Sequence, residues 1–154
     1  MENIFAIDKE TVYVNLFIPS VLSLPDSSLE VTVKTEEESP GRICLWIKAE
    51  GRRVFKIRRP YWAKGIPEIL IDGVPYEAHM QDGYVVLDRT WKDHAIIEIN
   101  WPCVLRYEAA PDRENYFVVF FGPYVLAALR GQEERLMLHA GNAVEDFERE
   151  VSRP

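Results

Sequence analysis

The chain has 154 residues, of which 47% are hydrophobic and 28% charged, proportions typical of a folded globular protein. Its formal net charge of −7 has the same sign as phosphate, which makes nucleic acids and anionic membranes poor partners. The longest apolar runs, such as Tyr116–Phe121, are far shorter than the ~20 residues of a membrane span. The start, Met1-Glu2-Asn3, lacks the basic and apolar regions of a signal peptide. We therefore expect a cytoplasmic protein that contacts neither nucleic acid nor membrane.

Cysteine and histidine residues are few and scattered. Cys44 and Cys103 have no Cys-x-x-Cys spacing, and His79, His94 and His139 are far apart in the chain. Such spacing indicates neither a metal site nor a disulfide framework. We expect no metal and no cofactor.

Alternation of apolar and polar residues with a period of two predicts β-strands along most of the chain. The alternating segments are 12–18, 29–34, 43–47, 55–58 and 97–101. Tyr116–Phe121 is apolar at every position, as in a central strand. Between the strands lie turn sequences, namely Ser39-Pro40-Gly41, Glu50-Gly51, Asp72-Gly73 and Asp82-Gly83. Nine of the ten prolines fall between Pro19 and Pro123, which disfavours long helices there.

These patterns predict an all-β protein, an antiparallel β-sandwich of jelly-roll-like type over residues 11–130. Residues 1–10 are expected to be an N-terminal lead-in, and residues 131–154 a C-terminal extension. Within that extension Val144–Val151 fits either a short helix or a frayed end.

Motifs for catalysis are lacking. The chain has no Gly-x-Ser-x-Gly elbow and no glycine-rich phosphate loop. Acidic residues such as Asp88, Glu108, Asp112 and Glu114 would form a glycosidase pair only at a fixed separation. With 25 acidic residues in the chain, solvated surface charge is the favoured interpretation. The basic residues between 52 and 59 are expected to form local salt bridges rather than an anion site.

Aromatic residues are the most suggestive feature. The tryptophans and one neighbouring tyrosine are Trp46, Tyr61, Trp62, Trp91 and Trp101, many for this length. An exposed indole stacks well on a sugar ring, and Tyr61, Trp62 and Trp91 lie in loop-like stretches where binding residues tend to occur. They are therefore candidate carbohydrate-binding residues. The favoured alternative is that the rings close the ends of the core.

Six short sequence motifs occur one after another along most of the chain. They are Tyr13–Ser20, Ile57–Ala63, Ile71–Gly73, Asp82–Tyr84, Asp88–Lys92 and Gly122–Ala127. In that order they resemble the β-sandwich region behind the catalytic barrel of glycoside hydrolase family 127 (GH127), the β-L-arabinofuranosidase family. The resemblance implies that catalysis in such a protein takes place in a separate (α/α)₆ barrel. In the family, a cysteine nucleophile of that barrel lies beside zinc-bound cysteines and a glutamate. Cys44 and Cys103 cannot supply that cluster, so no catalytic residue is carried over.

The resemblance implies a non-catalytic accessory domain that braces or completes a catalytic barrel of the same parent chain or assembly. Arg58 and Arg59, beside Tyr61 and Trp62, are candidate contacts with the barrel, because arginine and aromatic residues are enriched at interfaces. Two alternatives stay open. One is a carbohydrate-binding module that takes an oligosaccharide on exposed aromatics, and the other is a protein-interaction or oligomerisation domain with open strand edges.

Overall fold

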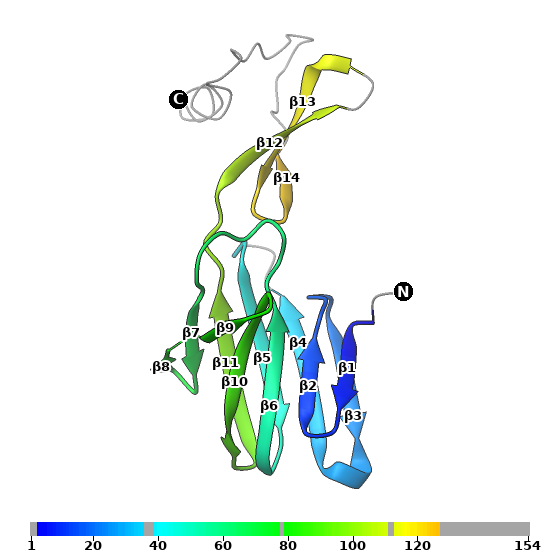
Figure 1. The fold of residues 1–154 in the computed structure, drawn as a ribbon, viewed down its shortest axis with the longest axis vertical. Coiled ribbons are helices and arrows are strands. Elements are labelled where there is room, and N and C mark those ends of the chain that lie inside the picture. Colours follow the sequence, from blue (N-terminus) through cyan, green and yellow to red (C-terminus); the bar gives the residue numbers. More distant parts are fainter. Residues whose placement is uncertain (1–2, 36–38, 78, 111–112, 127–154) are drawn as a thin grey trace. The chain divides into compact units, whose positions relative to one another are not determined.

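The structure is a computed structural model, and it describes residues 3–35, 39–77, 79–110 and 113–126. Regular structure in these residues is β-strand, apart from one 3₁₀ turn, which confirms the all-β class (Figure 1). The predicted extension 131–154, with its segment Val144–Val151, lies outside the described residues. No helix in the described ranges is long and apolar enough to cross a membrane.

The chain divides into two compact units, Met1–Pro102 and Cys103–Pro154. Unit 1 contains a five-stranded and a six-stranded sheet, and unit 2 a three-stranded sheet. The division falls inside the range 11–130, which the sequence analysis assigned to one sandwich. It falls there because the strands after Pro102 pair with one another.

The first sheet of unit 1 has the strand order β1-β2-β6-β10-β9. Its strands are β1 (Phe5–Asp8), β2 (Thr11–Val14), β6 (Gly51–Arg58), β10 (Tyr84–Trp91) and β9 (His79–Gln81). Neighbours are antiparallel except β2 and β6, which run parallel. Because β1 pairs with β2 along its whole length, the predicted lead-in 1–10 contributes an edge strand. The strand predicted over 12–18 ends at Val14, since the chain leaves the sheet before Pro19, which has no N–H to donate.

The second sheet of unit 1 has the order β3-β4-β5-β11-β7-β8 and is antiparallel throughout. Its strands are β3 (Ser20–Leu24), β4 (Leu29–Thr35), β5 (Arg42–Lys48), β11 (His94–Asn100), β7 (Glu68–Ile71) and β8 (Val74–Tyr76). The 3₁₀ turn η1 (Pro25–Ser27) joins β3 to β4.

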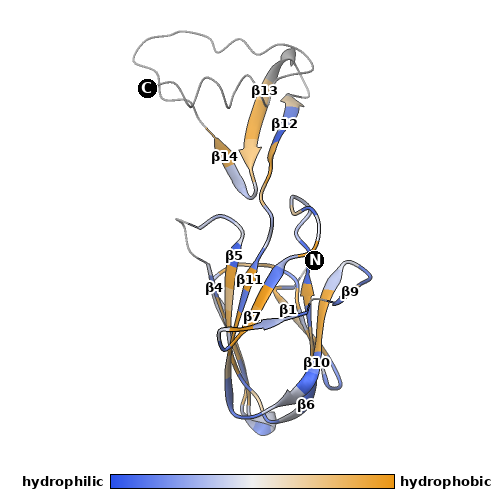
Figure 2. Ribbon diagram, turned by 90° about the vertical axis from the view of Figure 1, so that its left-hand side faces the viewer, coloured by the Kyte–Doolittle hydropathy of each residue, from blue (hydrophilic) through white to orange (hydrophobic). Residues whose placement is uncertain are grey.

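The core of unit 1 lies between these two sheets. Figure 2 shows them as separate layers, with β4 and β5 on one side and β6 and β10 on the other. Because side chains alternate between the faces of a strand, the apolar residues of each alternating segment all enter this layer. The buried apolar residues include Val12, Val14, Phe55, Ile57, Val85, Leu87 and Trp91 from the first sheet and Leu29, Val31, Val33, Ile43, Leu45, Ile47, Ile69, Ile71, Ile97 and Ile99 from the second. The predicted β-sandwich is thus confirmed.

Two hairpin turns follow the predicted chemistry. Asp72 and Gly73 between β7 and β8 both have positive φ, at 53° and 77°, as do Asp82 and Gly83 between β9 and β10, at 51° and 82°. Two successive positive φ angles define the turn that matches the twist of a hairpin. The Asp72 carboxylate also accepts a hydrogen bond of 2.8 Å from the backbone N–H of Ile96, which ties this turn to β11.

Unit 2, as described, is an antiparallel sheet of β12 (Leu105–Ala110), β13 (Arg113–Phe121) and β14 (Tyr124–Leu126). The apolar run Tyr116–Phe121 lies in β13, the middle strand, as predicted, but Phe117 and Val118 are exposed, so the strand is not covered on both sides as a buried central strand would be. The rings of Tyr107 and Phe117 meet edge to face across β12 and β13, with 5.6 Å between their centroids.

Salt bridges hold part of the basic segment on β6, as expected. The guanidinium of Arg52 donates hydrogen bonds of 3.1 and 2.9 Å to the two carboxylate oxygens of Asp88 on the neighbouring strand β10. The hydrogen bonds from Arg52, and its positive charge, lower the pKa of the Asp88 carboxyl from its ordinary value. Both side chains are exposed, so the pair is a surface feature of the first sheet.

Neighbouring isoleucines on β11 provide a matched test of the core. Ile97→Ala removes a side chain that is 0% exposed, and we expect a loss of about 2–5 kcal/mol in the free energy of unfolding. Ile96→Ala truncates a side chain 45% exposed on the opposite face and is expected to cost less than about 1 kcal/mol. Chemical denaturation of both variants measures the difference, and equal losses would contradict the sandwich core.

The salt bridge on the first sheet predicts a titration. Because the folded pKa of Asp88 is lowered, the pair contributes stability above the ordinary carboxyl pKa and loses it as the pH falls through the lowered value. In Arg52→Gln, the pKa of Asp88 should rise toward its ordinary value, as measured by carbon NMR of the Asp88 carboxyl. Arg42→Gln, which removes a cation paired with Glu98 on the other sheet, is the control and should leave this pKa unchanged.

Candidate functional site

Tyr61 and Trp62, two of the predicted carbohydrate-binding residues, lie in the loop that joins β6 to β7 (residues 59–67, the β6–β7 loop). Tyr61 is 82% exposed, whereas Trp62 is half-buried and packs against the core. The backbone N–H of Ala63 donates to the carbonyl of Pro60 at 3.1 Å, closing a turn around the two rings. The structure therefore presents one ring of the pair to solvent and uses the other as an anchor.

Arg58 and Arg59, the predicted interface residues, precede these rings. Arg58 ends β6 and is half-buried, while Arg59 is exposed. The backbone N–H of Arg59 donates to the carbonyl of Gly83 at 2.8 Å, which fixes the start of the β6–β7 loop to the turn between β9 and β10. The two arginines and Tyr61 thus belong to one short stretch of chain.

Trp91 requires a correction. The prediction that it is an exposed loop residue is wrong, because it ends β10 and is only 3% exposed. Its position in the alternation places it on the inner face with Leu87. The ring meets Phe55 edge to face at 5.0 Å, and its Nε1–H donates to the carbonyl of Arg53 at 3.0 Å. Trp91 therefore closes the core, as the alternative interpretation held, and offers no face to a sugar.

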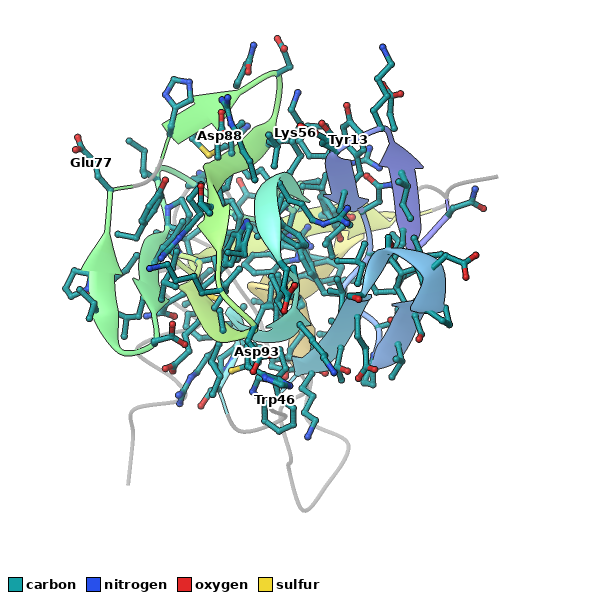
Figure 3. All side chains as sticks on the ribbon, turned by 90° about the horizontal axis from the view of Figure 1, so that it is seen from below. Tyr13, Trp46, Lys56, Glu77, Asp88 and Asp93 are labelled. Carbon is teal, nitrogen blue, oxygen red and sulfur yellow. The ribbon has the colours of Figure 1, made fainter. Side chains whose placement is uncertain are left out.

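Trp46 is an exposed aromatic residue that the sequence reasoning did not select. It lies in β5 with 43% of its surface exposed, and Figure 3 shows it on the opposite side of the sandwich from Tyr13, Lys56 and Asp88. The signal was present in the sequence. Because Leu45 and Ile47 face inward, the residue between them must face outward.

A hollow of about 330 Å³ lies beside Trp46 on the outer face of the second sheet. It is lined by residues of β4, β5 and β11, namely Glu30, Thr32, Trp46, Ile47, Lys48, His94, Ala95 and Ile96. The lining combines an indole with acidic, basic and hydroxyl groups, so it can bind a small ligand that has both apolar and polar surface.

In the described ranges, the two cysteines and the possible metal ligands are the groups from which a reactive thiol or a metal site would be built. Cys44 is half-buried in β5, and Cys103 is half-buried at the start of unit 2. Burial raises the pKa of the Cys103 thiol, which disfavours the reactive thiolate. Within the part of the chain that the structure describes, no three His, Cys, Asp or Glu side chains gather as metal ligands. Of the carboxylates considered from sequence, Asp112 lies outside the described residues.

Comparison with known proteins adds an independent line of evidence. A family model described as the middle domain of GH127 β-L-arabinofuranosidase matches residues 11–103. Comparison with curated proteins finds no match.

Three solved structures share the fold. A GH127 β-L-arabinofuranosidase from Geobacillus stearothermophilus T6 has 20% identity and a TM-score of 0.64, covering 79% of this chain and 21% of that one. A protein described as a glycoside hydrolase has 20% identity and a TM-score of 0.63, covering 79% and 22%. A GH127 β-arabinofuranosidase has 24% identity and a TM-score of 0.60, covering 79% and 23%. This chain therefore spans about a fifth of the length of the structures that it matches.

The family match covers more than half of the chain, and it ends at Cys103, next to the boundary between the two units. The sandwich of unit 1 is thus the part of the chain that the family model describes. The resemblance seen in the sequence is confirmed, and the chain belongs to the GH127 family, of which it carries the middle domain.

Proposed function

We propose that this chain is a non-catalytic accessory domain of a GH127-type glycoside hydrolase, and that it braces the catalytic barrel of the same parent chain or assembly. The observation that carries the proposal is the match to a GH127 middle domain over residues 11–103. A middle domain has neighbours in its own chain, and a neighbouring barrel is the partner that the family resemblance implies.

The β6–β7 loop is the surface that best fits a protein partner. It leaves the first sheet after β6 and enters the second at β7, so it crosses one end of the sandwich (Figure 1). Tyr61 and Ile66 are 82% and 64% exposed, while Ala63 and Pro67 are buried and hold the loop in place. An anchored loop that exposes large apolar side chains pays little ordering entropy on association, which favours a domain interface.

Arg58 and Arg59 extend this surface at its start. A guanidinium at the border of an aromatic contact can donate several hydrogen bonds to carboxylate or carbonyl oxygens of a partner. The proposed contact with the barrel therefore consists of Arg58, Arg59, Tyr61 and Ile66, with Trp62 as the internal anchor.

A protein-interaction or oligomerisation domain is the second candidate. The specific observation is that the two edge strands of the second sheet, β3 and β8, expose Val21 and Val74. An edge strand with exposed apolar residues can pair with another chain. A second copy of this chain would then take the place of the barrel as partner.

The proposal predicts binding without catalysis. The chain should bind a separately produced GH127 catalytic barrel, and the double variant Tyr61→Ala/Ile66→Ala should weaken that binding by about tenfold or more, since it removes the two apolar contacts. Val74→Ala is the control, because it shortens a side chain of similar exposure on β8. Affinity is measured by calorimetry, and the mass of the free chain is measured over a range of concentrations.

Two results would contradict the proposal. Release of sugar from a β-L-arabinofuranoside by the purified chain, abolished by a point substitution, would show that it is an enzyme. Absence of barrel binding together with a concentration-dependent mass would favour the second candidate.

A further inference from the structure

The outer face of the second sheet has an aromatic ring at its centre. Thr32 on β4 and Ile96 on β11 are the register neighbours of Trp46 on β5, so the three side chains form one row across the sheet. Trp46 and Ile96 are both substantially exposed, and Figure 3 shows the ring of Trp46 pointing away from the sandwich. Nothing in the packing of the core requires an indole at this position.

Lys34 supports the ring from one side. Its Nζ lies 3.3 Å from the centroid of the Trp46 ring, within the range of a cation–π interaction. The residues that line the hollow include the neighbouring row at Glu30 and Lys48 but not Lys34. Lys34 therefore covers one face of the indole, while the hollow extends from Trp46 toward the row of Glu30 and Lys48. A ring already held upright loses little freedom when a ligand stacks on it.

The next row supplies polar groups around the open face. Glu30, Lys48 and His94 are register neighbours on β4, β5 and β11, and all three are exposed. The imidazole Nδ1 of His94, the first residue of β11, lies 2.9 Å from a carboxylate oxygen of Asp93. The row offers a carboxylate that accepts hydrogen bonds, an ammonium that donates them, and an imidazole beside an aspartate.

This combination selects a particular class of ligand. A flat apolar face next to hydrogen-bonding groups of both signs matches a sugar ring, which has one face of C–H groups and a rim of hydroxyl groups. A strongly charged ligand would meet like charge on one side of the row, and the net charge of −7 further disfavours anions. The volume of about 330 Å³ suits one or two rings rather than a long chain.

We propose that the hollow beside Trp46 is a saccharide-binding site, which takes a ring of a neutral oligosaccharide on the open face of the indole, with Glu30, Lys48 and His94 bonding to its hydroxyl groups. The site lies on the outer face of a sheet and uses no residue of the β6–β7 loop. It therefore goes beyond the bracing role, and each proposal can fail without the other.

Trp46 can be observed directly in the intact chain, because the indole N–H groups of its four tryptophans give separate proton–nitrogen NMR signals. The signal of Trp46 is assigned with Trp46→Phe. The chain is then titrated with neutral arabinose-, xylose- and galactose-based oligosaccharides of two to four units. We expect at least one of them to shift the Trp46 signal saturably, while the signals of buried Trp91 and Trp101 stay in place.

Variants separate stacking from non-specific effects. Trp46→Ala should weaken the binding by about tenfold or more, because the apolar face is lost. Trp46→Phe, which keeps a smaller ring, should retain part of the affinity. Tyr61→Ala is the control, since it removes the exposed ring of the β6–β7 loop and should leave the affinity unchanged. The unmoved Trp91 and Trp101 signals in each variant report that the core is intact.

Two outcomes would overturn the proposal. In the first, none of the oligosaccharides shifts the Trp46 signal at millimolar concentration, which would leave the exposed indole to a protein contact. In the second, binding is observed but survives Trp46→Ala and is lost in Tyr61→Ala, which would place the sugar on the β6–β7 loop instead.

Discussion

Contact between the inner faces of the two sheets of unit 1 is the interaction on which the other features depend. Phe55 and Trp91 from the first sheet, and Leu45 and Ile97 from the second, are buried in one continuous cluster. No polar or charged residue in the described ranges is fully buried. Removal of this apolar surface from water is the dominant favourable contribution to folding, and it requires each strand to present one face inward. Only the outer faces of the sheets and the loops are then accessible to a partner or a ligand.

The same constraint explains where the candidate functional residues lie. Trp46 faces outward because Leu45 and Ile47 on either side of it face inward. Arg52 and Asp88 lie on the outer face of the first sheet for the same reason, and they are diagonal neighbours there, because Asp88 pairs with Val54 and Thr90 pairs with Arg52. Tyr61 is not subject to the alternation of a strand, because it lies in the loop that connects the two sheets. The candidate residues on the strands thus follow from the core pattern, whereas Tyr61 depends on the course of the loop.

Local patterns in the sequence predicted the elements that depend on local chemistry. Strand alternation and the Asp72-Gly73 and Asp82-Gly83 turns needed no knowledge of distant residues, and they were predicted. Features that depend on pairing between distant segments were not. One such feature is the parallel pairing of β2 with β6, and another is the division of the chain after Pro102. Both depend on contacts between residues far apart in the sequence, so no short stretch of sequence predicts them.

The candidate site shows the same limit. Trp91 was assigned to a loop-like stretch, yet β10 continues through Arg89 and Thr90 and carries the indole inward. Trp46 could have been identified as exposed from the alternation on β5 alone. The hollow beside Trp46 could not have been predicted in this way, because residues of β4 and β11 also line it, and these strands lie on either side of β5 in the sheet. Tyr61 was expected at a binding surface; its ring is exposed, and its part in binding stays a prediction.

We propose that this chain is a brace that binds a catalytic barrel. Binding to the folded state of a partner raises that partner's unfolding temperature in proportion to the logarithm of concentration. The most direct measurement is therefore the thermal unfolding of a separately produced GH127 barrel, followed calorimetrically with increasing amounts of this chain. We predict that the unfolding temperature of the barrel rises steadily as the chain is added. A barrel that unfolds at the same temperature at every concentration of the chain would contradict the account.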